Sequence, residues 1–138
     1  MPSSYHIEPE WNFVFIRHQG AMHRDKITRQ YHQLFEDPAY RPGMDILRDM
    51  REATLPEEYN YEYFKNISAN RYDDIEKNHG ECKIAWVVAS GRDFALAHQM
   101  LLIHRFSRRR FDTKTFREIA AALEWLGLPV SALPKESV

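Results

Sequence analysis

The sequence predicts one α/β domain with the element order β-β-α-β-α-β-α-β-α, a mixed sheet in which an antiparallel N-terminal hairpin is followed by parallel strands. Three observations predict it. Residues 13–18 are rich in aromatic and β-branched side chains and closely follow a shorter strand-like segment, while residues 83–90 form a nearly continuous apolar run. Helix-length segments separate the later strands, and parallel neighbours need such connections.

The first half of the chain is interpreted as two strands, a helix and a third strand. Strands are expected over residues 5–9 and 13–18, close enough together to form an antiparallel hairpin. A helix is expected over residues 22–36. Its apolar side chains repeat at helical spacing: Ile27, Tyr31, Leu34 and Phe35. Residues 44–50 are interpreted as the third strand, although Arg48 makes it less apolar than a strand buried on both faces.

The next helix is predicted from the residues at its N-terminus. Thr54-Leu-Pro-Glu57 has the pattern of a capping box, in which the hydroxyl and the glutamate satisfy backbone N–H groups of the first turn. Gly80 supplies the left-handed residue that often ends a helix. Tyrosines alternate with polar residues over 59–63 and leave a strand as the alternative there, but the capping box favours the helix.

The second half of the chain continues the alternation. Residues 83–90 form the most apolar strand and are expected inside the sheet, covered on both faces. A helix over residues 94–104 and a last strand over residues 111–116 follow. A final helix over residues 119–126 ends at Gly127.

Length, charge and composition exclude several classes of protein. The 138 residues suit one domain, assigned to residues 1–129, and residues 130–138 show no periodic pattern and are a predicted flexible tail. The formal net charge is −1, with 19 basic and 20 acidic side chains, so no global field attracts nucleic acid. No stretch reaches the ~18 apolar residues of a membrane span. Cys82 is the only cysteine, which excludes an internal disulfide and predicts a reducing, cytoplasmic compartment. The seven histidines show no i, i+4 pair, so neither a metal nor another cofactor is expected.

Four segments carry a resemblance to a known family. They are the strand ending in a glycine at 13–20, Asp49-Met-Arg51, Lys83-Ile-Ala-Trp-Val-Val, and residues 116–127, which end in Ala-Leu-Glu-Trp-Leu-Gly. With this element order, residues 5–128 resemble the STAS fold (sulfate transporter and anti-sigma-factor antagonist), in particular the small stand-alone bacterial SpoIIAA-like proteins. The resemblance keeps Phe116 in the last strand, where Thr115 and Glu118 alone would suggest a capping box.

The resemblance implies a non-catalytic module that binds partner proteins and, in some members, nucleotides or lipids. Signalling members are switched by phosphorylation of a serine that opens the helix after the third strand. Here that region, residues 49–56, has no Asp-Ser motif, and Thr54 is its only hydroxyl. Thr54 is therefore a candidate phosphoacceptor, with plain helix capping as the alternative.

Polar residues follow the second, third and fourth strands, at the edge where an open α/β sheet binds its ligands. This candidate rim for a ligand or partner consists of His18, Gln19, Asp49, Arg51, Ser90, Arg92 and Asp93. Ser90 and His18 together suggest a hydrolase, but Ser90 lacks the Gly-x-Ser-x-Gly elbow, and a helix cap formed with Asp93 is the competing interpretation. Asp49 and Arg51 are interpreted as a loop-ordering ion pair, with acid–base partners as the alternative. No catalytic residue is assigned.

Three further features suggest binding surfaces or a reactive group. The second helix carries more aromatic side chains than one face needs for packing, and the surplus suits a pocket or a dimer surface. These aromatic residues are Tyr59, Tyr61, Tyr63, Phe64 and Tyr72. Residues 104–111 interleave basic and aromatic side chains, which suits an anionic partner or, alternatively, a helix C-terminus. Cys82, beside Lys83, is interpreted as a small buried hydrophobe rather than a reactive thiol.

These observations support three hypotheses about function. The leading one is a non-enzymatic binding or regulatory module that engages a protein partner, or a second copy of itself, through the rim and the tyrosine-rich helix. The alternative is a small-molecule or lipid carrier, which would enclose an apolar cavity beneath residues 59–72. The third is a hydrolase using Ser90 and His18, which would need both side chains exposed and within hydrogen-bond reach of each other.

Overall fold

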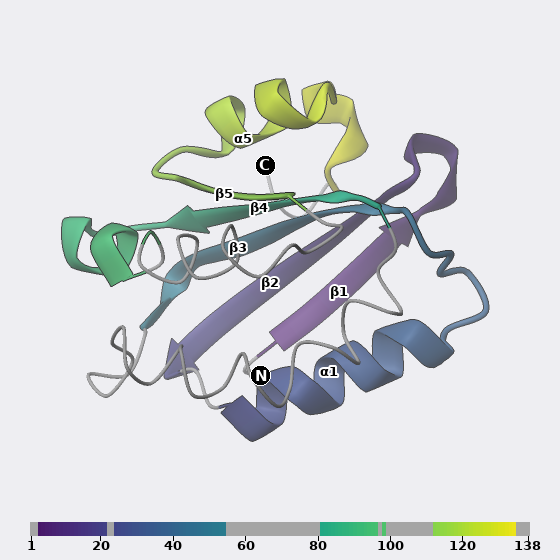
Figure 1. Cartoon of the computed structure of the whole chain (residues 1–138), viewed down its shortest axis with the longest axis horizontal. Coiled ribbons are helices and arrows are strands. Elements are labelled where there is room, and N and C mark those ends of the chain that lie inside the picture. The colour runs from purple at the N-terminus through teal and green to yellow at the C-terminus, as the bar shows by residue number, and fades with distance from the viewer. Residues whose placement is uncertain (1–2, 22–23, 55–80, 97, 99–111, 135–138) are drawn as a thin grey trace.

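Five strands form one sheet in the computed structural model of the chain, which describes residues 3–21, 24–54, 81–96, 98 and 112–134. The strands are β1 (Ser3–Glu8), β2 (Phe13–Ala21), β3 (Asp45–Thr54), β4 (Lys83–Val88) and β5 (Asp112–Phe116). Their spatial order follows the chain, with β1 antiparallel to β2 and the other neighbours parallel (Figure 1). The predicted fold class and the N-terminal hairpin are therefore confirmed.

A short 3-10 turn, η1 (Pro9–Trp11), joins β1 to β2. Proline has no N–H to donate to a ladder, and the first strand ends at Glu8 rather than at the predicted Pro9. Asn12 adopts a left-handed conformation with φ of 52°, which its short polar side chain tolerates, and pairing resumes with Phe13 opposite Glu8. The turn thereby sets the register that assigns the β2 side chains to their two faces.

Two hydrophobic clusters cover opposite faces of the sheet, because successive side chains of a strand alternate. Figure 1 shows α1 (Arg24–Glu36) on one side of the sheet and α5 (Ile119–Leu126) on the other, and these helices name the two faces. The α1 face is built around Val14, Ile16, Tyr31, Leu34, Ile46, Ile84, Trp86 and Val88. The α5 face is built around Phe13, Phe15, Leu47, Ala85, Val87, Phe116, Ala122 and Leu123. β4 is thus covered on both faces, as its apolar run predicted.

β2 and β3 extend beyond their predicted ends. The register shifts between Arg17 and Gln19, where β3 contains one extra residue, and pairing then continues as far as Ala21 opposite Thr54. A bulge of this kind accommodates the extra residue and allows polar strand ends to keep their ladder hydrogen bonds. The sequence analysis placed the end of each strand at its last apolar residues. Backbone pairing does not require apolar side chains, so both strands continue beyond that point.

The last helix has the predicted bounds. α5 ends at Gly127, whose φ of 72° is the left-handed conformation that glycine adopts without strain. The predicted flexible tail is wrong for its first residues, because Val130–Ala132 form a 3-10 turn, η2, and both Ala132 and Leu133 are buried in the α5-face cluster. Two apolar side chains in so short a turn create no periodicity, so the sequence pattern does not mark them.

β4 ends two residues before its predicted end, and the helix after it begins three residues earlier than predicted. The other remaining boundaries agree with the predictions or fall outside the described residues. β5 includes Phe116, so the STAS-like pattern is confirmed over the competing capping box. β4 ends at Val88, and helical residues begin at Gly91. The predicted second helix, residues 99–111 and residues 135–138 lie outside the described part of the chain. Within that part, no helix has the length and apolar character needed to cross a membrane.

Candidate functional site

The carboxyl ends of β2, β3, β4 and β5 meet at one edge of the sheet, because these strands are parallel. Figure 1 shows the arrowheads of β2 and β4 at this edge, on the left, and that of β1 at the opposite edge. The predicted rim residues lie at this edge, but strand alternation divides them between the two faces. Asp49 lies on the α5 face with Arg17, and His18 lies on the α1 face with Arg48.

Asp49 is a buried carboxylate held by two arginines. It accepts three hydrogen bonds from Arg51, from the backbone N–H at 3.1 Å, from Nε at 2.9 Å and from Nη2 at 3.0 Å. The Nε of Arg17 lies 3.6 Å from Asp49 Oδ2. Hydrogen bonding to Asp49 raises the pKa of Arg51 above its ordinary value. The predicted ion pair is present, but both residues lie in β3, so it joins side chains of one strand and does not order a loop.

Ser90 caps the helical segment that begins at Gly91. Its Oγ accepts a hydrogen bond from the backbone N–H of Asp93 at 3.0 Å, and its carbonyl accepts one from the N–H of Phe94 at 2.9 Å. The helix-cap interpretation is confirmed, and the oxygen that a hydrolase would use as nucleophile is held as an acceptor. Asp93 is buried, and its Oδ1 accepts a hydrogen bond from Arg92 Nη1 at 3.0 Å.

Two more contacts tie the strand ends together. The exposed side chains of Gln19 and Glu52 are joined by a hydrogen bond of 2.7 Å from Gln19 Nε2 to Glu52 Oε2. Arg117, directly after β5, donates from Nη2 to the carbonyl of Ala89 at 3.0 Å. Sequence reasoning misses Arg117, although its position directly after a strand is the same signal that selects the other rim residues.

His18 lies at the rim edge but is buried, with 2% of its surface exposed, so it is not the accessible rim side chain that the sequence predicted. Its Nε2 accepts a hydrogen bond from Arg48 Nε at 3.2 Å. Burial first, and the positive charge of Arg48 second, lower the pKa of His18 to about 2. The imidazole is therefore neutral and its Nε2 lone pair is occupied, which opposes its use as a general base for Ser90.

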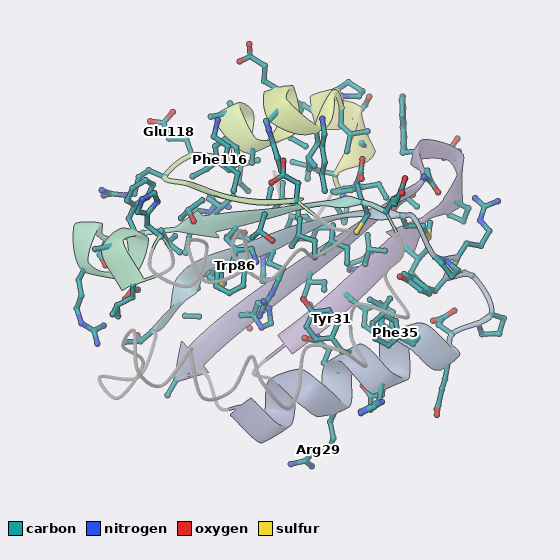
Figure 2. The ribbon with its side chains drawn as sticks, in the orientation of Figure 1. Arg29, Tyr31, Phe35, Trp86, Phe116 and Glu118 are labelled. Atoms are coloured by element: carbon teal, nitrogen blue, oxygen red, sulfur yellow. The ribbon has the colours of Figure 1, made fainter. Side chains whose placement is uncertain are left out.

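Arg48 is the residue whose placement the sequence analysis judges wrongly. Its charge predicts a less buried strand, yet the residue is only 4% exposed and lies on the α1 face. The Cζ of Arg48 lies 4.6 Å from the centroid of the Trp86 ring and 5.6 Å from that of Tyr31. Figure 2 shows Tyr31 pointing from α1 toward the sheet, and it shows Trp86 between α1 and the sheet. Among the described residues, no carboxylate lies within ion-pair distance of Arg48. The signal in the sequence that could have singled out Arg48 is a charged residue within an otherwise apolar strand.

The remaining candidates are Thr54, Cys82, the basic cluster at 104–111 and the aromatic residues of the predicted second helix. Thr54 is the exposed last residue of β3. Cys82 is buried, and burial, with a smaller contribution from Asp45, raises the pKa of its thiol to about 12, which confirms the buried-hydrophobe interpretation. The basic cluster at 104–111 lies outside the described residues, as do Tyr59, Tyr61, Tyr63, Phe64 and Tyr72. In the described part of the chain, no three His, Cys, Asp or Glu side chains come close enough to hold a metal ion.

Comparison with known proteins places the fold. No protein-family model matches the chain, and no curated protein matches it. Among solved structures, it is similar to an uncharacterised protein of the DUF3478 family from Shewanella loihica PV-4, which is described as having a SpoIIAA-like fold. The match covers 90% of this chain and 93% of that one, with a TM-score of 0.54 and 13% sequence identity. An identity this low is informative about the fold alone. The chain therefore has a SpoIIAA-like fold, as its resemblance to STAS domains predicted.

Proposed function

We propose that this chain is a non-enzymatic binding module whose strand-end rim engages an acidic segment of a protein partner. The orientation of two rim ion pairs carries the proposal. The side chains of Asp49 and Arg51 are 4% and 41% exposed, and those of Asp93 and Arg92 are 8% and 45% exposed. In both pairs the carboxylate is buried and the arginine side chain is partly exposed. The exposed side chain of each pair is therefore an arginine, although the exposed carboxylate of Glu52 also acts on Arg51 and the whole chain has a formal net charge of −1.

The contacts beneath the rim also hold its arginines in place. Arg51 is bound to Asp49 through three of its N–H groups, and Arg117 is bound to the carbonyl of Ala89. Side chains that are already ordered lose less conformational entropy on binding, and a planar guanidinium matches the geometry of a carboxylate. A protein surface rich in Asp and Glu is the partner that fits such a rim.

The same contacts support a role without catalysis. A hydrolase would need His18 as a base for Ser90, but His18 is buried and neutral, and the Oγ of Ser90 caps a helix. Among the described rim residues, no other pair combines a nucleophile with a base. A second copy of the chain is the alternative occupant of the rim, and the experiment below distinguishes it from a different protein.

Photo-crosslinking in cells of the protein's own host tests this proposal. The photoreactive amino acid p-benzoylphenylalanine replaces Gln19 at the rim or, as a matched control, Gln33 on the exposed side of α1. We expect irradiation to yield an adduct from the rim position and none from the control position. The double variant Arg51→Glu/Arg92→Glu is expected to abolish the adduct, because reversed charges repel an acidic partner.

Mass spectrometry of the adduct then identifies the crosslinked chain, and circular dichroism verifies that the double variant is folded. No adduct at the rim, equal adducts at both positions, or an adduct that survives the charge reversal would contradict the proposal. An adduct between two copies of this chain would replace the proposed partner by a homodimer.

A further inference from the structure

The helical segment that follows β4 turns one row of residues toward solvent at the rim edge. Figure 1 shows this segment, in green, beyond the end of β4. Asp93 is buried and Leu96 packs against the α1-face cluster, so these two residues face the sheet. Gly91, Phe94 and His98 are exposed and are spaced three and four residues apart, so they share the opposite side of the helix.

The outward row contains an exposed aromatic pair. Phe94 is 36% exposed, and its ring is stacked with that of His98, with an interplanar angle of 3° and 6.4 Å between the centroids. The pair offers a flat apolar surface to a partner, and protein interfaces are enriched in aromatic side chains. A single exposed aromatic residue is nevertheless common on protein surfaces, so the significance of Phe94 depends on the group that lies beside it.

That group is the guanidinium of Arg117, which lies against the first residue of the row. Its Nη2 donates to the carbonyl of Ala89 at 3.0 Å, and its Nη1 lies 4.0 Å from the position that a Cβ of residue 91 would take. Arg117 is exposed, and in the described part of the chain no carboxylate lies within ion-pair distance of it, in contrast to Arg51 and Arg92. Gly91 and Phe94 are about one helical turn apart, so an ordered cation lies next to the exposed aromatic pair.

We infer that Arg117 and Phe94 together recognise an acidic side chain that adjoins a large apolar one in the partner segment. The inference rests on the function proposed above and adds the second chemical feature of the partner. The carboxylate pairs with the guanidinium, and the apolar side chain covers the ring of Phe94. Charge alone would accept any acidic segment, whereas an apolar contact beside the charge rejects segments that lack the apolar side chain. Covering the exposed part of a phenylalanine removes about 70 Å² of apolar surface from water, which corresponds to about tenfold in affinity.

Photo-crosslinking beside Phe94 locates the contact in the full chain. p-Benzoylphenylalanine replaces Ala95, an exposed neighbour of Phe94, in cells of the protein's own host, and mass spectrometry maps the crosslinked residue of the partner. We expect the same partner as at Gln19, crosslinked in a segment that holds an acidic residue beside a large apolar one. An adduct at Gln19 but none at Ala95, or a mapped segment without such a pair, would overturn the inference and leave the proposed function standing. No adduct at either position would overturn both.

A synthetic peptide of the mapped segment then measures the two contacts by calorimetric titration of the full chain. Phe94→Ser is expected to weaken binding about tenfold and Phe94→Leu, which keeps apolar surface, about twofold. Arg117→Gln is expected to weaken binding about tenfold, because the peptide carboxylate loses its cation. Trp11→Ser is the matched control and should leave binding unchanged, since Trp11 is 38% exposed but lies before the start of β2, at the opposite edge of the sheet.

A matching change in the peptide shows whether the two apolar groups touch. Replacing its large apolar residue with serine should weaken binding to the wild type about tenfold and should weaken binding to Phe94→Ser no further. Circular dichroism verifies that each variant is folded. Equal binding by the wild type and Phe94→Ser would overturn the inference. If Arg51→Glu/Arg92→Glu still abolished binding in that case, the proposed function would stand without it.

Discussion

Replacing His18 with glutamine tests the buried contact between His18 and Arg48. The carbonyl oxygen of a glutamine side chain can accept the hydrogen bond from Arg48 Nε, but it does not titrate. In the folded protein the pKa of His18 is lowered to about 2, whereas a histidine in an unfolded chain has a pKa of about 6.5. The unfolded chain therefore binds a proton that the folded chain excludes, and acid favours unfolding.

The two pKa values set the size of this effect. The contribution of a neutral His18 is fully present above the unfolded pKa of about 6.5 and is lost as the pH falls below it, by ~1.4 kcal/mol per pH unit. About two pH units below the unfolded value, at about pH 4.5, the loss reaches ~2.7 kcal/mol. The folded imidazole is still neutral at that pH, because its own pKa is about 2.

Urea unfolding followed by tryptophan fluorescence, at about pH 7.5 and about pH 4.5, measures the effect. Between these conditions the wild-type chain is expected to lose ~2.7 kcal/mol more than His18→Gln in its free energy of unfolding. Taking the difference between the two proteins cancels the titration of the carboxylates that they share. His32→Gln, at an exposed position of α1, controls for the loss of an imidazole. An equal pH dependence in the wild type and His18→Gln would refute the reasoning, because the folded protein would then accept the proton.

Three further predictions concern Ser90, Leu133 and Cys82. Ser90→Ala removes the acceptor of the Asp93 N–H and should lower the free energy of unfolding by about 1 kcal/mol in urea titrations, and an unchanged value would mean that the cap contributes nothing. Leu133→Ala should lower the free energy of unfolding by about 2 kcal/mol, because Leu133 is buried in the α5-face cluster. Val130→Ala, at an exposed residue, should lower it far less. Equal small losses in the two variants would mean that Leu133 does not pack in the core and that the predicted flexible tail is correct. The thiol of Cys82, whose pKa burial raises to about 12, should resist iodoacetamide at about pH 8 until urea unfolds the chain, and rapid labelling of the native protein would contradict its burial.

Elements that end through local contacts were predicted well. Gly127 ends α5 because its backbone N–H bonds the carbonyl of Glu124 from a left-handed conformation that glycine favours. Ser90 caps its helix through a hydrogen bond to Asp93, three residues away. Both contacts lie within a few residues of chain, so no distant partner was needed to recognise them. β3 differs, since its extension to Thr54 depends on pairing with β2 beyond the bulge.

The sequence predicted that the candidate site lies at one edge of the sheet. It did not predict how the residues of the site divide between the two faces. Strand alternation sends Asp49 to the α5 face, where it supports exposed arginines, and His18 to the α1 face, where it is buried. His18 and Arg48 are 30 residues apart in the chain, and their hydrogen bond exists only in the observed register. Because a shift of one residue moves every side chain of a strand to the other face, no local pattern predicts such a contact.

By itself, the sequence determined the class of fold, the antiparallel hairpin and the edge where polar residues gather, because apolar periodicity and strand order are properties of the chain. Only the tertiary structure decided that Arg48 is buried between Trp86 and Tyr31, and that Leu133 belongs to the core. Burial depends on what packs over a face, and that packing follows from pairing between distant segments.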